Sequence, residues 1–337
     1  MGCTKSGTSL LRNLLDGHPD LFVIPAETHF FQNIGIWVSY FFRKTAPKKQ
    51  MIDEMKLSLI NWLEISNTKT NELADGFSKG KWNIEIFEQN IRSKEVTSTK
   101  ELFDLFVESL YLALYGETYK NQLRFVEKSV ENTEFALDYL KLYPEAKFIH
   151  IIRNPYSNLV ALRKFKKKAK EQNLKGNSYP LFSAFNSMYQ SYYALYRNQR
   201  LLNKEQYFVL KYEDLLNFPK ENMTAIAQFL NIQYQDSLLQ PTLIGRLWGG
   251  NSTNDIKFKN ISNKNIDKWK DEITDFEIHS INSLFNHILE DFEYEKIKPK
   301  HGINRLTRKE GIMTYLINRL MFKFLPLSKP HKNINNK

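Results

Sequence analysis

The sequence predicts an α/β fold in which a parallel β-sheet is flanked by helices and carries a helical insertion. Short apolar runs alternate with longer segments of helical periodicity between residues 124 and 230. This alternation implies right-handed crossovers between parallel strands. A turn of small residues also stands directly before an amphipathic helix near the start of the chain. With 337 residues, of which 42% are hydrophobic, the chain can bury one large core.

The first expected element is a short helix that follows the turn Lys5–Ser9. Its buried stripe consists of four leucines in the spacing of one helical face, and Gly17 and Pro19 end it. A helix start leaves backbone N–H groups unpaired and carries about half a positive charge. A glycine, hydroxyl residues and a lysine at this point therefore predict an anion-binding site.

The remaining elements follow in order along the chain. Strands are expected at 21–24, 124–128, 147–153 and 206–212. Helices are expected at 30–43, 51–65, 100–115, 133–144, 156–170, 180–203 and 219–230. The first three of these helices predict a cap at residues 30–120, inserted in a domain that spans 1–295. Residues 296–337 predict a basic amphipathic extension.

Polar residues follow the ends of three expected strands. Ligands of open parallel sheets bind beyond the carboxyl ends of the strands. This rule selects Lys128, Arg153 and Tyr212, each at or just beyond a strand end. We therefore expect them to join the opening turn in one binding site.

The charge of the chain indicates an acidic partner. Its formal net charge is +11 and its pI is about 9.3. Neither a zinc spacing nor a known nucleic-acid module is present, so we expect no nucleic-acid partner. A triphosphate-binding P-loop would place its lysine after the second glycine, and a dinucleotide fold would need three spaced glycines after a full strand. Neither pattern fits the opening turn.

At this point the sequence resembles a known family. The stretches "TKSGTSLLRNLLDGHPD" and "FIHIIRNPYSNLVALRKF" resemble the two phosphate-binding segments of sulfotransferases that use 3′-phosphoadenosine 5′-phosphosulfate (PAPS). The order of "GHPD", "ET", "YEDL" and a late "GNS…KW" segment is most similar to the tyrosylprotein and heparan-type branch. The likeness covers most of residues 2–295. It implies a P-loop-like sheet and transfer of a sulfuryl group to a hydroxyl or amine of a carbohydrate, tyrosine peptide or lipid.

The resemblance also implies roles for individual residues. It makes Glu27 the base that takes the acceptor proton, with His29 as the competing candidate, and Lys128 the second catalytic lysine after Lys5. Ser252 would bind the sulfuryl or 5′-phosphate oxygens and is also assigned to catalysis. The residues implied in donor binding are Lys5, Ser6, Gly7, Thr8, Ser9, Arg153, Tyr212, Ser252 and Lys268.

The chain departs from the family pattern at one position. The family places a serine eight residues beyond the 3′-phosphate arginine, and here that position is Ala161. Ser157 or the basic run 163–168 would have to compensate, and otherwise weaker donor affinity is expected. An alternative function follows, in which the chain is an inactive homologue that binds a nucleotide or a glycan. No metal is expected, whereas a P-loop kinase would require magnesium.

The acceptor, the compartment and the oligomeric state stay open at this level. Aromatic residues of the expected cap would suit an acidic peptide, a sulfated glycan or a glycolipid: Phe30, Phe31, Trp37 and Tyr40. Residues 312–325 predict a helix that packs on its own domain or contacts a membrane surface. The single cysteine, Cys3, excludes an intrachain disulfide. We expect a cytoplasmic protein if the chain is complete, and possible membrane anchoring if a preceding segment is missing.

Overall fold

The computed structural model describes residues 1–35, 52–68, 82–120, 122–171, 181–250, 260–300 and 320. The chain divides into two compact units, each of which combines segments that are far apart in the sequence. Unit 1 consists of Met1–Thr8, Lys147–Pro219 and Ser262–Lys337. Unit 2 consists of Ser9–Ala146 and Lys220–Ile261.

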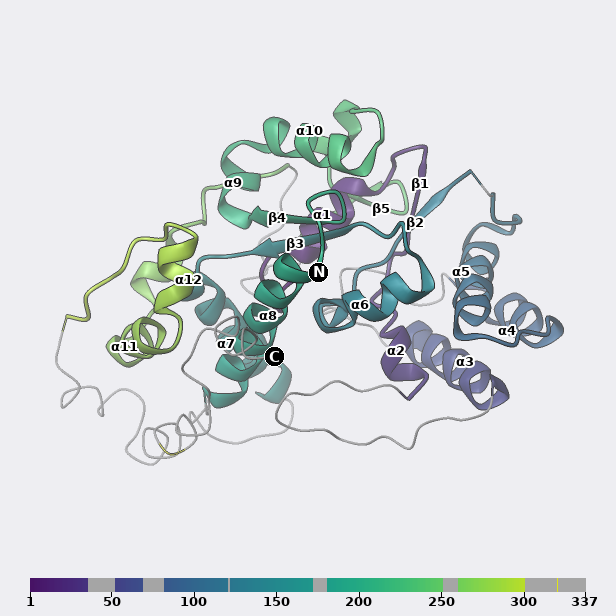
Figure 1. Cartoon of the computed structure of the whole chain (residues 1–337), viewed down its shortest axis with the longest axis horizontal. Coiled ribbons are helices and arrows are strands. Elements are labelled where there is room, and N and C mark those ends of the chain that lie inside the picture. The colour runs from purple at the N-terminus through teal and green to yellow at the C-terminus, as the bar shows by residue number, and fades with distance from the viewer. Residues whose placement is uncertain are drawn as a thin grey trace. The chain divides into compact units, whose positions relative to one another are not determined.

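Unit 1 contains a parallel strand pair, β3 (Phe148–Ile152) and β4 (Tyr207–Lys211), which run side by side in Figure 1. The start of the chain adds to the other edge of β3. Gly2 forms a parallel bridge with Ile151, and the amino group of Met1 donates to the carbonyl of Ile149 at 2.8 Å. A short piece of strand thus precedes the opening turn. Its close approach explains Gly2, because an added Cβ would lie 2.4 Å from the Ile151 carbonyl oxygen.

The helices of unit 1 pack around this strand pair. The element bounds are α7 (Pro155–Glu171), α8 (Phe182–Leu201), α9 (Tyr212–Asn217), η2 (Lys268–Asp271), α11 (Asp275–Leu284) and α12 (Asn286–Asp291). Helix α7 packs against α8, η2 and α11. Leu159 and Leu162 of α7 and Leu195 of α8 are fully buried. The two leucines of α7 are three positions apart, which is the spacing of one helical face.

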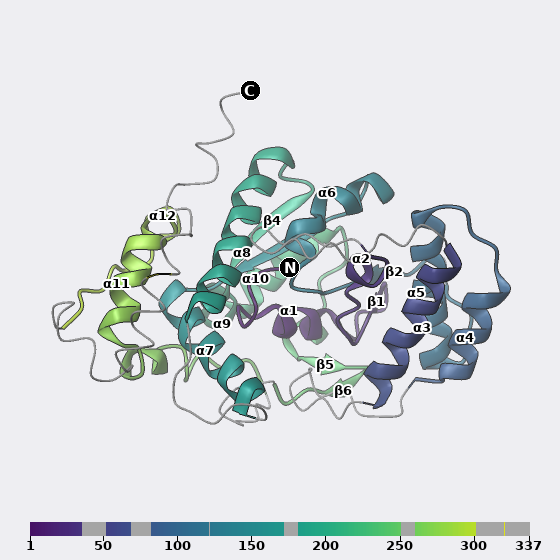
Figure 2. The ribbon, with the colours of Figure 1, turned by 90° about the horizontal axis from the view of Figure 1, so that it is seen from below.

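Unit 2 contains a second parallel pair, β1 (Leu21–Val23) and β2 (Arg124–Val126), and a small antiparallel hairpin, β5 (Thr242–Leu243) and β6 (Arg246–Leu247). Its helices are α1 (Thr8–Leu15, begun by the last residue of unit 1), α2 (Phe30–Asn33), α3 (Ile52–Thr68), α4 (Ile84–Ser93), α5 (Thr99–Tyr115), α6 (Asn132–Leu142), α10 (Pro219–Leu230, begun likewise) and η1 (Asp236–Leu239). Helices α3, α4 and α5 lie together in both views (Figures 1 and 2).

Aromatic side chains form the core around α5 and α2. Phe103 of α5 lies 4.4 Å from Phe30 between ring centroids, and Phe31 stacks on Phe135 at 4.8 Å. Both Phe30 and Phe31 are buried. The expectation that these two phenylalanines offer an acceptor surface is therefore wrong, because they fill the core. Trp37 and Tyr40 lie outside the described residues.

The predicted fold class is confirmed, since parallel strands are flanked by helices. One expected helix is shorter than predicted: α2 ends at Asn33, and Gly35 follows with a φ of 88°. The expected extension and its segment 312–325 lie outside the described residues, apart from Leu320. Within the described residues, no helix is both long and apolar enough to cross a membrane.

Candidate active site

The opening turn of unit 1 has the backbone of an anion-binding loop. Lys5 has a φ of 67° and Gly7 a φ of 108°, both in the left-handed range. The turn leads into the N-terminus of α1, whose first N–H groups can bind an anion. The Ser6 hydroxyl is buried and has no hydrogen-bond partner within the described part of the chain. An oxygen-rich ligand would satisfy this group.

Gly7 is fixed by the ring of Tyr212. A Cβ added to Gly7 would lie 2.3 Å from Cδ2 of Tyr212, so no other residue fits. The guanidinium of Arg153 lies over the same ring at 4.7 Å from its centroid. Burial raises the pKa of Tyr212 and the charge of Arg153 lowers it, with a net increase that leaves the phenol neutral. Tyr212 therefore supports both the loop and the arginine.

Arg153 connects the opening turn with α7. Its Nη1 donates to the carbonyl oxygen of Lys5 at 2.9 Å, and its Nε donates to the Ser157 hydroxyl at 2.9 Å. The Asn154 backbone N–H that follows donates to the carboxylate of Glu213 at 3.0 Å. The structure thus unites Lys5, Arg153 and Ser157, and it places a hydroxyl beside the arginine although Ala161 carries none.

Three basic side chains, those of Lys5, Arg163 and Lys164, contact other residues of unit 1. The ammonium of Lys5 lies 4.9 Å from the ring centroid of Phe165 on α7. In the basic run, Arg163 and Lys164 form ion pairs with Glu277 and Glu272. These two side chains therefore do not replace the serine missing at 161.

The predicted donor-binding residues Lys268 and Ser252 stay predictions. Lys268 is exposed on η2. Its neighbour Trp269 is buried and stacks on Tyr156, at 5.5 Å between centroids. Ser252 lies outside the described residues.

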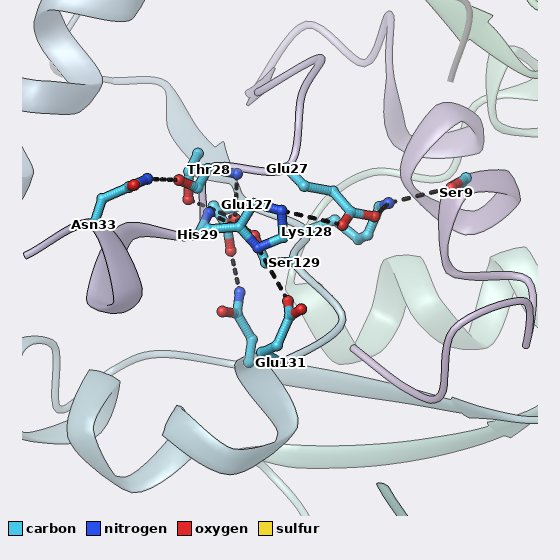
Figure 3. A network of polar contacts seen from close by, with 10 residues as sticks. Ser9, Glu27, Thr28, His29, Asn33, Glu127, Lys128, Ser129 and Glu131 are labelled. Carbon is cyan, nitrogen blue, oxygen red and sulfur yellow. Dashed lines mark hydrogen bonds and ion pairs between the residues drawn. The ribbon is translucent and has the colours of Figure 1, made fainter. Parts of the chain in front are cut away.

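In unit 2, three predicted site residues meet where β1 and β2 end. The strands are parallel and in register, with Val23 opposite Val126, so the segments that follow them lie at one edge. The ammonium of Lys128 forms an ion pair with Glu27 and donates to the Ser9 hydroxyl at 3.1 Å. Figure 3 shows this chain of contacts. Only 5% of the Lys128 side chain is exposed, so its charge depends on these partners.

His29 and Glu131 extend the same cluster. Nδ1 of His29 lies 3.1 Å from Oε2 of Glu131, and Nε2 lies 3.6 Å from Oε2 of Glu27. Burial would lower the pKa of His29, but the hydrogen bond with Glu131 and the negative charges around it outweigh burial and raise it. Burial raises the pKa of Glu131, but the hydrogen bond with His29 and the charge of His29 outweigh burial and lower this pKa overall. The contact thus favours the protonated form of His29 and the ionised form of Glu131.

A third carboxylate, Glu127, joins both segments. It accepts hydrogen bonds from the Thr28 hydroxyl at 2.7 Å, from the Ser129 hydroxyl at 2.6 Å and from the Asn132 amide. The Ser129 hydroxyl in turn accepts from the His29 backbone N–H at 3.0 Å. Sequence reasoning assigned no site role to Glu127, Ser129 or Glu131. The available signal was the polar stretch "EKSVEN" directly after a strand.

Glu27, His29 and Glu131 also satisfy the spacing of a cation site, since one ligand atom of each lies within 4.8 Å of the others. Glu27 contacts Lys128, and His29 contacts Glu131. The cluster can bind an anionic group through Lys128 and accept a proton through a carboxylate.

Comparison with known proteins identifies relatives. A model of the sulfotransferase family matches residues 1–236. Omega-hydroxy-beta-dihydromenaquinone-9 sulfotransferase Stf3 from Mycobacterium bovis is 24% identical over 250 residues, which cover 69% of this chain and 62% of that protein. The Mycobacterium tuberculosis protein of the same name matches equally. The alignment thus spans less than two thirds of these relatives.

One solved structure shares the fold. The sulfotransferase domain from the curacin biosynthetic pathway superposes with a TM-score of 0.55 at 19% identity, over 88% of this chain and 96% of that domain. At this level of identity the likeness supports the architecture alone.

Proposed function

The chain belongs to the sulfotransferase family, and from this premise we propose that it transfers a sulfuryl group from PAPS to a hydroxyl or amine acceptor. The observation that carries the proposal is the cluster of Glu27, Lys128 and Ser9 at the ends of two parallel strands. It combines a proton-accepting carboxylate with a buried cation, which are the two groups that metal-free sulfuryl transfer needs.

The donor would be held by residues whose chemistry suits its phosphates. The opening turn offers the buried Ser6 hydroxyl, and the start of α1 offers backbone N–H groups. Arg153, with the adjacent Ser157 hydroxyl, suits the 3′-phosphate. We assign Thr8 and Ser9 to the same loop and Tyr212 to support of the adenosine side. Ser252 and Lys268 stay predictions from the resemblance.

Each catalytic residue has a separate task in this proposal. PAPS supplies the activated sulfuryl group when bound. The resemblance assigns Lys5 and Lys128 to the negative charge that develops on the leaving phosphate, because cations stabilise such charge. Glu27 accepts the proton of the acceptor. His29, the competing base, is the weaker candidate because its raised pKa favours the protonated form.

For the acceptor we favour a hydroxyl group, and a lipid alcohol is the first class to test. The curated relatives are named for sulfation of a hydroxylated menaquinone, and the net charge of +11 also suits an acidic peptide or a sulfated glycan. Contact of residues 312–325 with a membrane surface would suit a lipid acceptor. The alternative function is an inactive homologue that retains nucleotide or glycan binding.

A transfer assay tests the proposal. The chain is incubated with ³⁵S-labelled PAPS and excess EDTA, together with a tyrosine peptide, an oligosaccharide or a polyprenyl alcohol. We expect label in at least one acceptor. Binding of the donor without transfer to any acceptor would instead support the inactive homologue. A requirement for added magnesium would contradict a metal-free sulfotransferase and favour a kinase.

A further inference from the structure

We propose that His29, oriented by Glu131, takes the acceptor's proton from Glu27 and passes it to solvent. This inference rests on the proposed function, because it concerns how the base is regenerated after each transfer. No motif of the resemblance assigns a role to Glu131, and His29 entered only as an alternative base. In the folded chain, His29 contacts both Glu27 and Glu131.

The geometry is that of a short relay. The two oxygens of Glu27 have different neighbours, since Oε1 contacts the Lys128 ammonium and Oε2 lies 3.6 Å from Nε2 of His29. The other ring nitrogen, Nδ1, is 3.1 Å from Glu131. Figure 3 shows the imidazole of His29 between the two carboxylates. A carboxylate on one nitrogen orients the ring so that the other nitrogen can exchange a proton.

The backbone also holds His29 in place. Its φ of 46° and ψ of 39° are left-handed, a conformation that residues with a Cβ adopt uncommonly. Its N–H donates to Ser129 at 3.0 Å, and the amide of Asn33 donates to the Thr28 carbonyl at 2.8 Å. Fixed backbone strain of this kind recurs at functional sites. At this position the left-handed residue is a histidine, and its imidazole lies beside Glu27.

Exposure increases along the relay. The exposed fraction of the side chain is 5% for Lys128, 28% for Glu27, 35% for His29 and 38% for Glu131. A proton that reaches His29 is therefore closer to water than one held on Glu27. The buried lysine marks the inner end of the path.

The proton balance is complete. The acceptor O–H bond breaks as its oxygen bonds to sulfur, and the proton goes to the Glu27 carboxylate. Neutral His29 then takes the proton at Nε2, which restores the Glu27 carboxylate and forms an imidazolium paired with Glu131. Water or a buffer base removes the proton from His29, and the cycle needs no further reactant.

The relay has a defined pH dependence. The charged groups that face His29 are Glu27 from the segment after β1, and Glu127 and Glu131 from the segment after β2. Their charges raise the pKa of His29 above its usual value. Only neutral His29 can accept a proton, so kcat should rise with pH through this pKa and level off above it.

A titration without donor or acceptor tests the coupling. In protein with isotope-labelled histidine, the His29 signal is identified by its loss in His29→Asn, because asparagine tolerates the left-handed backbone. We expect Glu131→Gln to lower the pKa of His29 strongly and Glu27→Gln to lower it less. The control Glu88→Gln, whose carboxylate pairs with Arg92 on α4, should leave it unchanged. If Glu27→Gln had no effect on His29, the relay would be overturned.

Turnover then tests the role, with the panel acceptor that the wild-type chain labels fastest. In His29→Asn, we expect the pH dependence of kcat to disappear and kcat to fall at least about tenfold, within the usual range for proton-transfer groups. Added imidazole should restore turnover. Affinity for 3′-phosphoadenosine 5′-phosphate should stay within about threefold.

The outcomes separate this inference from the proposed function. An unchanged pH profile in His29→Asn, or equal losses of turnover and nucleotide affinity without imidazole rescue, would overturn the relay alone. If the wild-type chain transferred no label, the proposed function would fail and the relay with it, whereas the titration would still report whether the three side chains interact.

Discussion

Gly7 is the residue at which the opening turn accepts no side chain. It combines a φ of 108° with contact to the Tyr212 ring, where an added Cβ would lie 2.3 Å from a ring carbon. We expect Gly7→Ala to lower the free energy of unfolding by about 2–4 kcal/mol, since it adds backbone strain and overpacking. Affinity for 3′-phosphoadenosine 5′-phosphate should fall with it. Urea denaturation and calorimetry measure the two effects.

Gly245 provides the matched control. Its φ is 65°, but an added Cβ would meet no atom within 4 Å. Gly245→Ala should therefore cost only about 1 kcal/mol, the usual penalty of a left-handed residue. Equal losses in the two variants would show that backbone conformation alone, and not contact with Tyr212, requires glycine at position 7.

Glu27→Gln separates proton transfer from donor binding. The amide keeps the size of the side chain but cannot take the acceptor proton, so we expect turnover to fall about 10²- to 10⁴-fold. Nucleotide affinity should change little, because the glutamine oxygen can still accept from Lys128. Lys5→Ala, by contrast, should lower turnover through loss of positive charge at the leaving phosphate. Calorimetry that found nucleotide binding lost and turnover retained in Glu27→Gln would refute the assignment of the base.

The sequence located most of the candidate site but not its internal pairing. Glu127 and Glu131 are the carboxylates nearest to Lys128 in sequence, yet the folded chain pairs it with Glu27. Such partners depend on the register of β1 and β2, which could not be predicted from this sequence alone. Motif resemblance found Glu27 and Lys128 because it carries tertiary information that spacing lacks.

At the scale of elements, adjacent residues of α7 form one ion pair with α11 and another with the residue that follows η2, and the first of these pairs is the more buried. The Arg163–Glu277 side chains are 22% and 0% exposed, and the Lys164–Glu272 side chains are 29% and 33% exposed. Burial raises the pKa of Glu277, which Arg163 partly offsets. We expect Arg163→Met to cost about 3–5 kcal/mol of stability because it leaves a buried carboxylate unpaired.

Lys164→Met is the control on the same helix and should cost about 1 kcal/mol or less. The double variant Arg163→Met with Glu277→Gln should recover part of the loss, because the unpaired charge is removed. The denaturation midpoints of the wild-type chain, the two single variants and the double variant measure these losses of stability. Similar losses in both single variants would mean that burial of Glu277 does not set the strength of its ion pair.

Several helices were predicted closely, whereas α4, α9, α11 and α12 were missed. The helix expected at 219–230 is α10 (Pro219–Leu230), and that expected at 133–144 is α6 (Asn132–Leu142). Their apolar periodicity extends over three turns, which makes the pattern legible. The six-residue α9 was missed, since Tyr212 was read as a strand end. So brief a helix depends on tertiary contacts rather than on its own periodicity.

At the scale of the whole molecule, sequence order gives little indication of which segments pack together. Unit 1 joins the first eight residues to segments that begin at Lys147 and Ser262. The predicted domain spanning 1–295 and its cap at 30–120 therefore stay predictions. What composition does indicate is the chemistry of the partner, because a net charge of +11 favours anionic ligands.

Ligand-dependent hydrogen exchange across the full chain tests this anion preference. With 3′-phosphoadenosine 5′-phosphate at about 100 times its Kd, binding stabilises the folded state by about 2.7 kcal/mol. We expect exchange to slow most in residues 3–9 and 153–158, where the opening turn and Arg153 lie. Adenosine 5′-phosphate, which lacks the 3′-phosphate, should protect 3–9 but not 153–158. Equal protection of 153–158 by both nucleotides would remove Arg153 and Ser157 from 3′-phosphate recognition, and stronger protection by ATP with magnesium would favour a triphosphate site.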